Sequence, residues 1–311
     1  MKQHKPMLLP SACDALTAKL IEQAGFPAYQ IGGFAMDGMR FGYPDMDVTR
    51  LGEKSAVVRD IVHASDLPVL VDCDDGYGDE KNVVHTIHTY DDLGVAAIFM
   101  EDQKSPKKCG HMSGKEVVET QVMVNKLKAA RSARRSAEKL FILARTDALA
   151  VNGLKDAIRR AEQYLKAGAD GIYIEGPENV EQLRAIGKEF KGEPLAVTIL
   201  ENGGKTPWIS PEEMYGMGFN MILYPTTLLF RQTKAVLRAL DDLKAGRPMP
   251  KSEGVSMMDF EKIVDIAYWK AVEWTLLTGR RLKRRPCHWE SASARQSTSW
   301  QKKLHDPRRL P

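Results

Sequence analysis

Short apolar runs rich in β-branched residues alternate along the chain with longer amphipathic stretches, beginning near residue 7. A polar or glycine-containing turn follows each run, a pattern typical of a buried strand that leads into a helix. The predicted strands lie at residues 7–12, 28–33, 68–74, 96–102, 141–147, 171–176, 195–200 and 220–225. The predicted helices lie at residues 14–25, 53–65, 83–94, 116–133, 154–168, 179–190 and 227–246.

This alternation of strands and helices predicts a (β/α)8 TIM-type barrel, the α/β fold in which eight parallel strands close on themselves. An open doubly wound sheet is the alternative, but the near-regular spacing of the repeats favours closure. Gly25, Gly94 and Gly168 each stand between a predicted helix and the next strand. A glycine in the left-handed conformation commonly ends a helix at such a place.

The C-terminal part of the chain differs from the rest in charge and pattern. We expect the barrel to occupy residues 1–246 and a helical extension to occupy residues 247–279, where 259–279 predicts an amphipathic helix that needs a partner. Residues 280–311 contain ten lysines and arginines against two acidic residues, although the whole chain has a net charge of only +4. Because this segment lacks hydrophobic periodicity, we expect a disordered, solvated tail rather than a nucleic-acid-binding arm.

The composition excludes several classes of protein. The chain is 43% hydrophobic and 28% charged, as in ordinary globular proteins. Its apolar runs are too short to span a bilayer, and the first residues lack the apolar core of a signal peptide. The four cysteines show no paired spacing, which argues against a disulfide framework. We therefore expect a cytoplasmic location, without nucleic-acid or membrane partners.

Charged side chains gather at the ends of the predicted strands. They are Asp72, Asp74, Glu101, Asp102, Arg145, Asp147, Glu175 and Glu201. In a barrel these ends open on one face, where active sites are built, and carboxylates crowded there repel one another unless a cation neutralises them. Oxygen ligands without a histidine cluster suit Mg²⁺ or Mn²⁺ better than zinc. A lone carboxylate at a strand end is more often a cap or an ion-pair partner, and Asp74-Asp75-Gly76 could form only a turn.

One cysteine stands in a basic, flexible stretch, SPKKCGHMSGK at residues 105–115. Cys109 could be a metal ligand, a reactive thiol or an inert side chain. Cys109 and His111 supply only two ligands, so a zinc site is disfavoured. Neighbouring lysines and a histidine favour a reactive thiol.

Four segments resemble the isocitrate lyase/phosphoenolpyruvate mutase superfamily, and within it the short-chain lyases that act on 2-methylisocitrate, 2,3-dimethylmalate or 2-alkylmalates. These segments are VDCDDGYGD (71–79), MEDQKSPKKCGHMSGK (100–115), LARTDALAVNGLKDAIRRAEQYLKAGAD (143–170) and ENGGKTPW (201–208). The resemblance covers residues 7–280 and implies the same barrel. It also implies a homotetramer in which the helix at 259–279 is exchanged between subunits.

The resemblance assigns roles to individual residues. Asp72 would bind Mg²⁺ directly, and Asp45, Asp74 and Glu101 would hold it largely through water. The residues implied in substrate binding are Tyr29, Gly32, Gly33, Gly110, Arg145, Glu175 and Asn202. Three positions depart from the pattern of these lyases: Ile31 replaces a serine or threonine, Thr198 an asparagine and Asp47 a glycine. They predict an altered substrate.

The implied reaction is a retro-aldol-type cleavage of a 2-hydroxy dicarboxylate or tricarboxylate. Cys109 would donate a proton to the departing carbanion, and Lys107, Lys108 and His111 would lower its pKa. The loop that carries it would close over the substrate. Tyr29 or a metal-bound water could be the base. Two alternatives stay open: a carboxyphosphonoenolpyruvate-type phosphonomutase and a non-catalytic paralogue that binds oxyacids.

Overall fold

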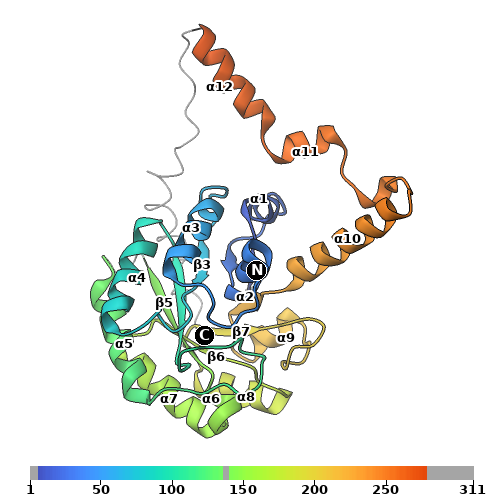
Figure 1. Ribbon diagram of the computed structural model, residues 1–311. Helices are drawn as coiled ribbons and strands as arrows, with labels where there is room; N and C mark the ends of the chain where they lie inside the picture. The colour runs from blue at the N-terminus through green and yellow to red at the C-terminus, as the bar shows by residue number, and fades with distance from the viewer. Residues whose placement is uncertain (1–5, 136–139, 279–311) are drawn as a thin grey trace, which may run out of the picture.

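Figure 1 shows the chain as a computed structural model that describes residues 6–135 and 140–278. Every predicted strand is present: β1 (Met7–Pro10), β2 (Tyr29–Ile31), β3 (Val69–Asp72), β4 (Ala97–Glu101), β5 (Phe141–Thr146), β6 (Gly171–Ile174), β7 (Leu195–Thr198) and β8 (Met221–Tyr224). The strands are parallel, in the order β1-β8-β7-β6-β5-β4-β3-β2. A parallel bridge between Ser11 and Gln30 links the two ends of this order. The predicted (β/α)8 barrel is therefore confirmed.

Helices follow the strands and surround them. The predicted ones are α1 (Ala15–Gln23), α3 (Leu51–Val62), α4 (Glu80–Asp92), α5 (Thr120–Ala133), α7 (Leu154–Ala167), α8 (Val180–Glu189) and α10 (Thr227–Lys244). The sequence did not reveal α2 (Gly33–Met36), α6 (Ala148–Asn152) and α9 (Pro211–Gly216), which are too short to show a helical period. The glycine caps are confirmed, with φ of 80° at Gly25, 75° at Gly94 and 107° at Gly168.

The apolar side chains of the strands belong to two hydrophobic layers, one inside the barrel and one between the strands and the helices. Leu9, Leu70 and Phe99 belong to the inner layer, which fills the barrel. The larger outer layer packs the strands against the helices and includes Tyr29 and Ile31. Successive side chains of a strand point to opposite faces. Gln30, which lies between those two residues, therefore points inward, where it lines the mouth of the barrel.

After α10 the chain leaves the barrel and forms two further helices (Figure 1). The turn between them contacts α1, where Gln23 donates to the carbonyl of Ile263 at 3.2 Å and Lys19 Nζ lies 3.4 Å from Asp265 Oδ2. The prediction of a single helix at 259–279 is wrong, because the chain forms α11 (Met257–Ile263) and α12 (Ile266–Thr278) instead. Asp265 separates them with a φ of 60°, a left-handed conformation that cannot continue a right-handed helix. Large apolar side chains on this arm face solvent: Phe260 is 40% exposed, Trp269 64% and Leu277 80%.

Some predictions about the chain as a whole are not tested by this fold. The tail at 280–311 falls outside the described residues, and the boundaries of the regions 1–246 and 247–279 stay predictions. Across the described ranges, no helix is both long enough and apolar enough to cross a membrane. The cytoplasmic location also stays a prediction.

The packing of α8 leads to a prediction about stability. A Cβ at Gly187 would overlap the carbonyl oxygen of Met217, whereas a Cβ at Gly52 in α3 would meet nothing within 4 Å. We expect Gly187→Ala to destabilise the fold by about 1–3 kcal/mol, because the backbone must shift. We expect the control Gly52→Ala to stabilise it by roughly 0.5–1 kcal/mol, because alanine favours the helix. Thermal unfolding followed by circular dichroism checks both, and a Gly187→Ala protein that melts at or above the wild-type temperature would contradict this packing.

Candidate active site

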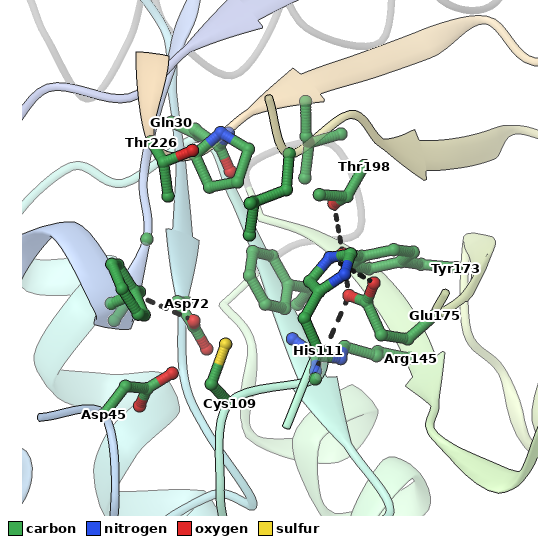
Figure 2. Close-up of a pocket in the computed structure, with 18 residues that line it drawn as sticks. Gln30, Asp45, Asp72, Cys109, His111, Arg145, Tyr173, Glu175, Thr198 and Thr226 are labelled. Carbon is green, nitrogen blue, oxygen red and sulfur yellow. Dashed lines mark hydrogen bonds and ion pairs between the residues drawn. The ribbon is translucent and has the colours of Figure 1, made fainter. Parts of the chain in front are cut away.

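A pocket lies at the carboxyl ends of the strands, where strand-end residues meet the loop between β4 and α5 (Figure 2). The predicted site residues that line it are Gly32, Gly33, Asp45, Asp72, Cys109, Gly110, His111, Arg145 and Glu175. Asp72 ends β3, Arg145 lies near the end of β5 and Glu175 follows β6. The barrel therefore brings together residues that are far apart in the sequence, as the strand-end pattern predicted.

Two buried lysines hold the acidic side of the site together. Lys107 Nζ contacts Asp45 and lies 2.5 Å from Asp74 Oδ1. Lys54 Nζ lies 2.5 Å from Asp74 Oδ2. The lysine side chains are 2% and 1% exposed, so water screens these pairs far less than it screens surface ion pairs. Asp74 contacts both lysines, but Asp45 pairs with Lys107, so removing Lys107 would leave the buried Asp45 carboxylate without that partner, which is strongly destabilising.

The two aspartates of the Asp-x-Asp motif differ in their surroundings. The Asp72 carboxylate accepts hydrogen bonds from the main-chain N–H of Gly33 at 2.9 Å and of Asp74 at 3.0 Å. Burial, and then repulsion by Asp74, raises the pKa of Asp72. Burial acts in the same direction on Asp74, but Lys107 and Lys54 outweigh it and lower the pKa of Asp74 to about 2. Asp74 also lies beyond the end of β3 at a φ of 47°, so it does not continue the strand.

Asp45, Asp72, Asp74 and Glu101 form an acidic cluster that the described structure does not arrange as a metal site. Burial raises the pKa of Glu101 well above its usual range, and Glu101 Oε1 is buried without a hydrogen-bond partner among the described residues. Among all the residues that the structure describes, no three aspartate, glutamate, histidine or cysteine side chains are grouped so that they could hold a metal ion. The Lys107 ammonium stands between Asp45 and Asp74 instead. The donors are carboxylate oxygens, which Mg²⁺ and Mn²⁺ prefer.

Arg145 is the positive centre of the other side of the pocket. Its Nε lies 2.9 Å from Asp147 Oδ2, and its Nη1 lies 3.1 Å from Glu101 Oε2. Its guanidinium also lies 5.3 Å from the ring centroid of Tyr173, a cation–π contact. Acidic neighbours raise the pKa of Arg145 despite its burial, so the side chain stays charged and can bind an anionic ligand.

His111 and Glu175 complete this side of the pocket. His111 Nδ1 accepts a hydrogen bond from the main-chain N–H of Lys205 at 3.1 Å, so the proton of a neutral imidazole lies on Nε2. That Nε2 is 3.3 Å from Glu175 Oε1. Burial would raise the pKa of Glu175, but Arg145 and then His111 outweigh it and hold that pKa well below its usual range. Glu175 is therefore a carboxylate beside the imidazole, and His111 Nε2 has no hydrogen-bond partner among the described residues.

The loop that carries Cys109 is closed over the pocket. Cys109 is only 8% exposed, and its main-chain N–H donates to the carbonyl of Asp45 at 3.0 Å. A Cβ at Gly110 would overlap the side chains of Arg145 and Glu175. Only glycine lets the loop approach these two residues so closely.

The pKa of Cys109 differs from the sequence-based expectation. Burial, and then the charge of Asp45, raises the pKa of the thiol to about 12. The prediction of a lowered pKa is wrong, because Lys107 pairs with the acidic cluster and Lys108 binds a carbonyl of the loop. The main-chain N–H of His111 does lower the pKa of the thiol, but burial and Asp45 outweigh it. The thiol therefore keeps its proton at neutral pH, which suits a proton donor.

The structure does not bring every predicted residue to the pocket. Tyr29 and Ile31 belong to the outer layer, and Asn202 is not among the residues that line the site. Burial strongly raises the pKa of Tyr29, so the structure gives it no role as a base. Thr198 does line the pocket, where its hydroxyl contacts Tyr173.

Other residues of the site escaped the sequence analysis. Gln30 and Thr226 line the pocket, Lys54 binds the acidic cluster, and Lys115 Nζ binds the carbonyl of Gly110 and lies 2.6 Å from Asp147. Strict alternation along β2 would have pointed to Gln30. The lysines carried no local signal, because a lysine on a helix or loop is most often a surface residue.

The chain is similar to known proteins along most of its length. A family profile described as phosphoenolpyruvate phosphomutase matches residues 1–244. The 2,3-dimethylmalate lyase of Eubacterium barkeri is 37% identical over 285 residues, which are 90% of this chain and 96% of the relative. The 2-methylisocitrate lyase of Bacillus subtilis is 39% identical over 236 residues, 76% of each chain. The chloroplastic carboxyvinyl-carboxyphosphonate phosphorylmutase of Arabidopsis thaliana is 35% identical over 273 residues, 86% of this chain and 80% of the relative.

Solved structures show the same likeness. A crystal structure of 2,3-dimethylmalate lyase superposes with a TM-score of 0.82 at 30% identity, covering 88% of this chain and 91% of the other. Phosphonopyruvate hydrolase, crystallised with oxalate and Mg²⁺, superposes with a TM-score of 0.79 at 25% identity, covering 88% and 95%.

The environment of Cys109 leads to a prediction about its reactivity. With a pKa of about 12, a thiol is almost entirely protonated at about pH 9, where an ordinary cysteine is largely thiolate. We expect iodoacetamide to alkylate Cys109 much more slowly in the folded protein than in the urea-unfolded protein, as measured by peptide mass mapping over a pH series. A folded protein whose Cys109 reacts as fast as an unfolded thiol would contradict the raised pKa and the closed loop.

Proposed function

The chain belongs to the phosphoenolpyruvate phosphomutase family, in the isocitrate lyase/phosphoenolpyruvate mutase superfamily, and we propose that it splits a 2-hydroxy dicarboxylate or tricarboxylate with the help of Mg²⁺. Its similarity to 2,3-dimethylmalate lyase and 2-methylisocitrate lyase identifies it as a carbon–carbon lyase. The proposed products are a 2-oxoacid such as pyruvate and a second carboxylic acid. The observation that carries the proposal is that one pocket is lined by Asp45 and Asp72 of the acidic cluster, the charged Arg145 and the protonated thiol of Cys109.

The acidic cluster is the proposed cation site. Asp45, Asp72, Asp74 and Glu101 would hold Mg²⁺ through their carboxylate oxygens, and Mn²⁺ would fit the same donors. When bound, the ion polarises the 2-oxygen of the substrate and the carboxylate beside it. The unpartnered Glu101 Oε1 and the raised pKa values of Asp72 and Glu101 support this role, because crowded buried carboxylates need a positive charge nearby.

Arg145 and His111 are the proposed binding groups for the second carboxylate of the substrate. Both line the pocket, and the Nε2 proton of His111 is available for a hydrogen bond. Gly33 donates its main-chain N–H to Asp72, and a Cβ at this position would come within 3.1 Å of the Asp72 carboxylate, so glycine keeps the main chain close to the proposed cation site. These contacts orient the bond to be cleaved between the cation site and Arg145.

Cys109 is the proposed proton donor. As the carbon–carbon bond breaks, its electron pair passes to the carbon that carries the second carboxylate. The 2-hydroxyl would pass its proton to a water molecule in the site, the candidate base that remains once Tyr29 is excluded, and would become the carbonyl of the 2-oxoacid. Cys109 Sγ gives its proton to the carbanion and is left as a thiolate, which recovers a proton before the next turnover. The closed loop keeps water from this carbanion.

The apolar part of the pocket lining favours an alkyl-substituted dicarboxylate over a tricarboxylate. Leu200, Leu223 and Pro225 are among the residues that line the pocket, as are Thr198 and Thr226. Arg145, which supplies the positive charge of the lining, is already assigned to the second carboxylate together with His111. A third carboxylate would therefore be buried without a cationic partner, which costs several kcal/mol. An alkyl group would instead pack against the leucines.

Substrate assays test this function. We expect Mg²⁺-dependent release of a 2-oxoacid from 2,3-dimethylmalate or a 2-alkylmalate, with a lower kcat/KM for 2-methylisocitrate. Chelation by EDTA should abolish the activity, and Cys109→Ser should lower kcat about 100-fold or more with little change in KM, because the lost proton transfer belongs to the transition state. Absence of turnover with all three classes of acid, or full activity of Cys109→Ser, would contradict the proposal.

A phosphonomutase is the second candidate, because the Arabidopsis relative named carboxyvinyl-carboxyphosphonate phosphorylmutase is 35% identical. Phosphorus NMR separates the two candidates. A new carbon–phosphorus bond formed from a carboxyphosphonoenolpyruvate-type substrate would support the mutase, whereas a lyase forms none.

We also propose that the chain forms a homotetramer in which the α11–α12 arm packs on a neighbouring subunit. The exposed Phe260, Trp269 and Leu277 support this arrangement, because large apolar side chains gathered on one arm are typical of an interface. We expect light scattering to give the mass of a tetramer, and Trp269→Glu with Leu277→Glu to give smaller species. The same mass in wild type and double variant would argue against this packing.

A further inference from the structure

Asp47 lies two residues after Asp45, but its side chain is directed at the loop between β4 and α5 rather than at the acidic cluster. Asp47 Oδ2 accepts hydrogen bonds from Ser105 Oγ at 2.8 Å and from the main-chain N–H of Lys107 at 3.3 Å. The Asp47 side chain is fully buried, although Met46 and Val48 on either side are 46% and 53% exposed. Asp47 therefore joins the loop to the segment that precedes α3.

Arg50 contacts both Asp47 and Ser105, so the three side chains form one cluster. Arg50 Nη1 lies 2.9 Å from Asp47 Oδ1, and Arg50 Nη2 donates to Ser105 Oγ at 3.3 Å. Each of the three side chains thus contacts the other two. The Asp47 carboxylate accepts hydrogen bonds from a hydroxyl and a main-chain N–H and forms an ion pair with the guanidinium. Hydrogen bonds to a charged acceptor are stronger than those between neutral groups.

The backbone of Asp47 is held in a sparsely populated conformation. Its φ is 65°, in the left-handed region that most residues other than glycine avoid. Aspartate tolerates this region better than most side chains do, but the conformation persists only where surrounding contacts fix it. At Asp47 the conformation directs the carboxylate inward, against the loop.

We propose that Asp47 is a positioning residue that latches the Cys109 loop in its closed position over the pocket. The latch acts on Ser105 and the main chain of Lys107, and Cys109 follows two residues later. Asp47 therefore sets where the thiol lies without touching the substrate. Its importance for the chemistry depends on the proposed function, but the latch itself is a property of the loop.

Alkylation of Cys109 measures how often the loop opens, because a buried thiol reacts only from the open state. We expect Asp47→Gly to raise the alkylation rate by about tenfold at every pH, since it removes the hydrogen bonds but suits the left-handed backbone. Asp47→Asn should raise the rate less, because its amide oxygen can still accept from Ser105. Arg50→Gln, which keeps the aspartate, should also raise the rate less.

Glu116→Gln is the matched control. It removes the exposed ion pair that Glu116 forms with Lys104 at 3.0 Å at the base of the same loop, without touching Asp47. We expect Cys109 of Glu116→Gln to be alkylated at the wild-type rate. We also expect Asp47→Gly to unfold at the wild-type temperature. Equal alkylation rates in wild type and Asp47→Gly, or an equal rise in Glu116→Gln, would overturn the latch. If Asp47→Gly fails to fold, Asp47→Asn decides the question. None of these readouts requires turnover, so the failure of the proposed function would leave them valid.

Discussion

Buried carboxylates repel one another, and the mouth of this barrel gathers Asp45, Asp72, Asp74 and Glu101 with almost no exposed surface. The positive charge that offsets them comes from Lys54 on α3 and Lys107 on the loop after β4. Because one of these cations belongs to the barrel and the other to the loop, neutralising the cluster also closes the loop. The position of Cys109 follows from that closure.

The hydrophobic period predicted the fold well, because burial acts on every strand and helix in the same way. It could not locate α2, α6 and α9, which are shorter than the pattern they would have to show. It also missed the break at Asp265, where one left-handed residue divides a stretch whose apolar spacing continues on both sides. A pattern averaged over many residues does not reveal the conformation of one.

The candidate site was predictable where residues lie at strand ends, because a barrel gathers those ends whatever the details of packing. The site was less predictable where a shift of one residue along a strand decides whether a side chain faces the pocket or the helices. Tyr29 faces the helices, and Gln30 beside it faces the pocket. The thiol of Cys109 is the clearest case. Its sequence neighbours are basic, but in space burial and Asp45 determine its pKa.

Gly110 has a consequence for the order of events at the site. Its main chain packs directly against Arg145 and Glu175, with Cys109 on one side of it along the loop and His111 on the other. The group assigned to give a proton and the group assigned to bind a carboxylate are therefore carried by three consecutive residues of one loop. Cys109 and His111 therefore enter and leave the pocket together when the loop closes and opens. Binding of the carboxylate and placement of the proton donor are then a single event.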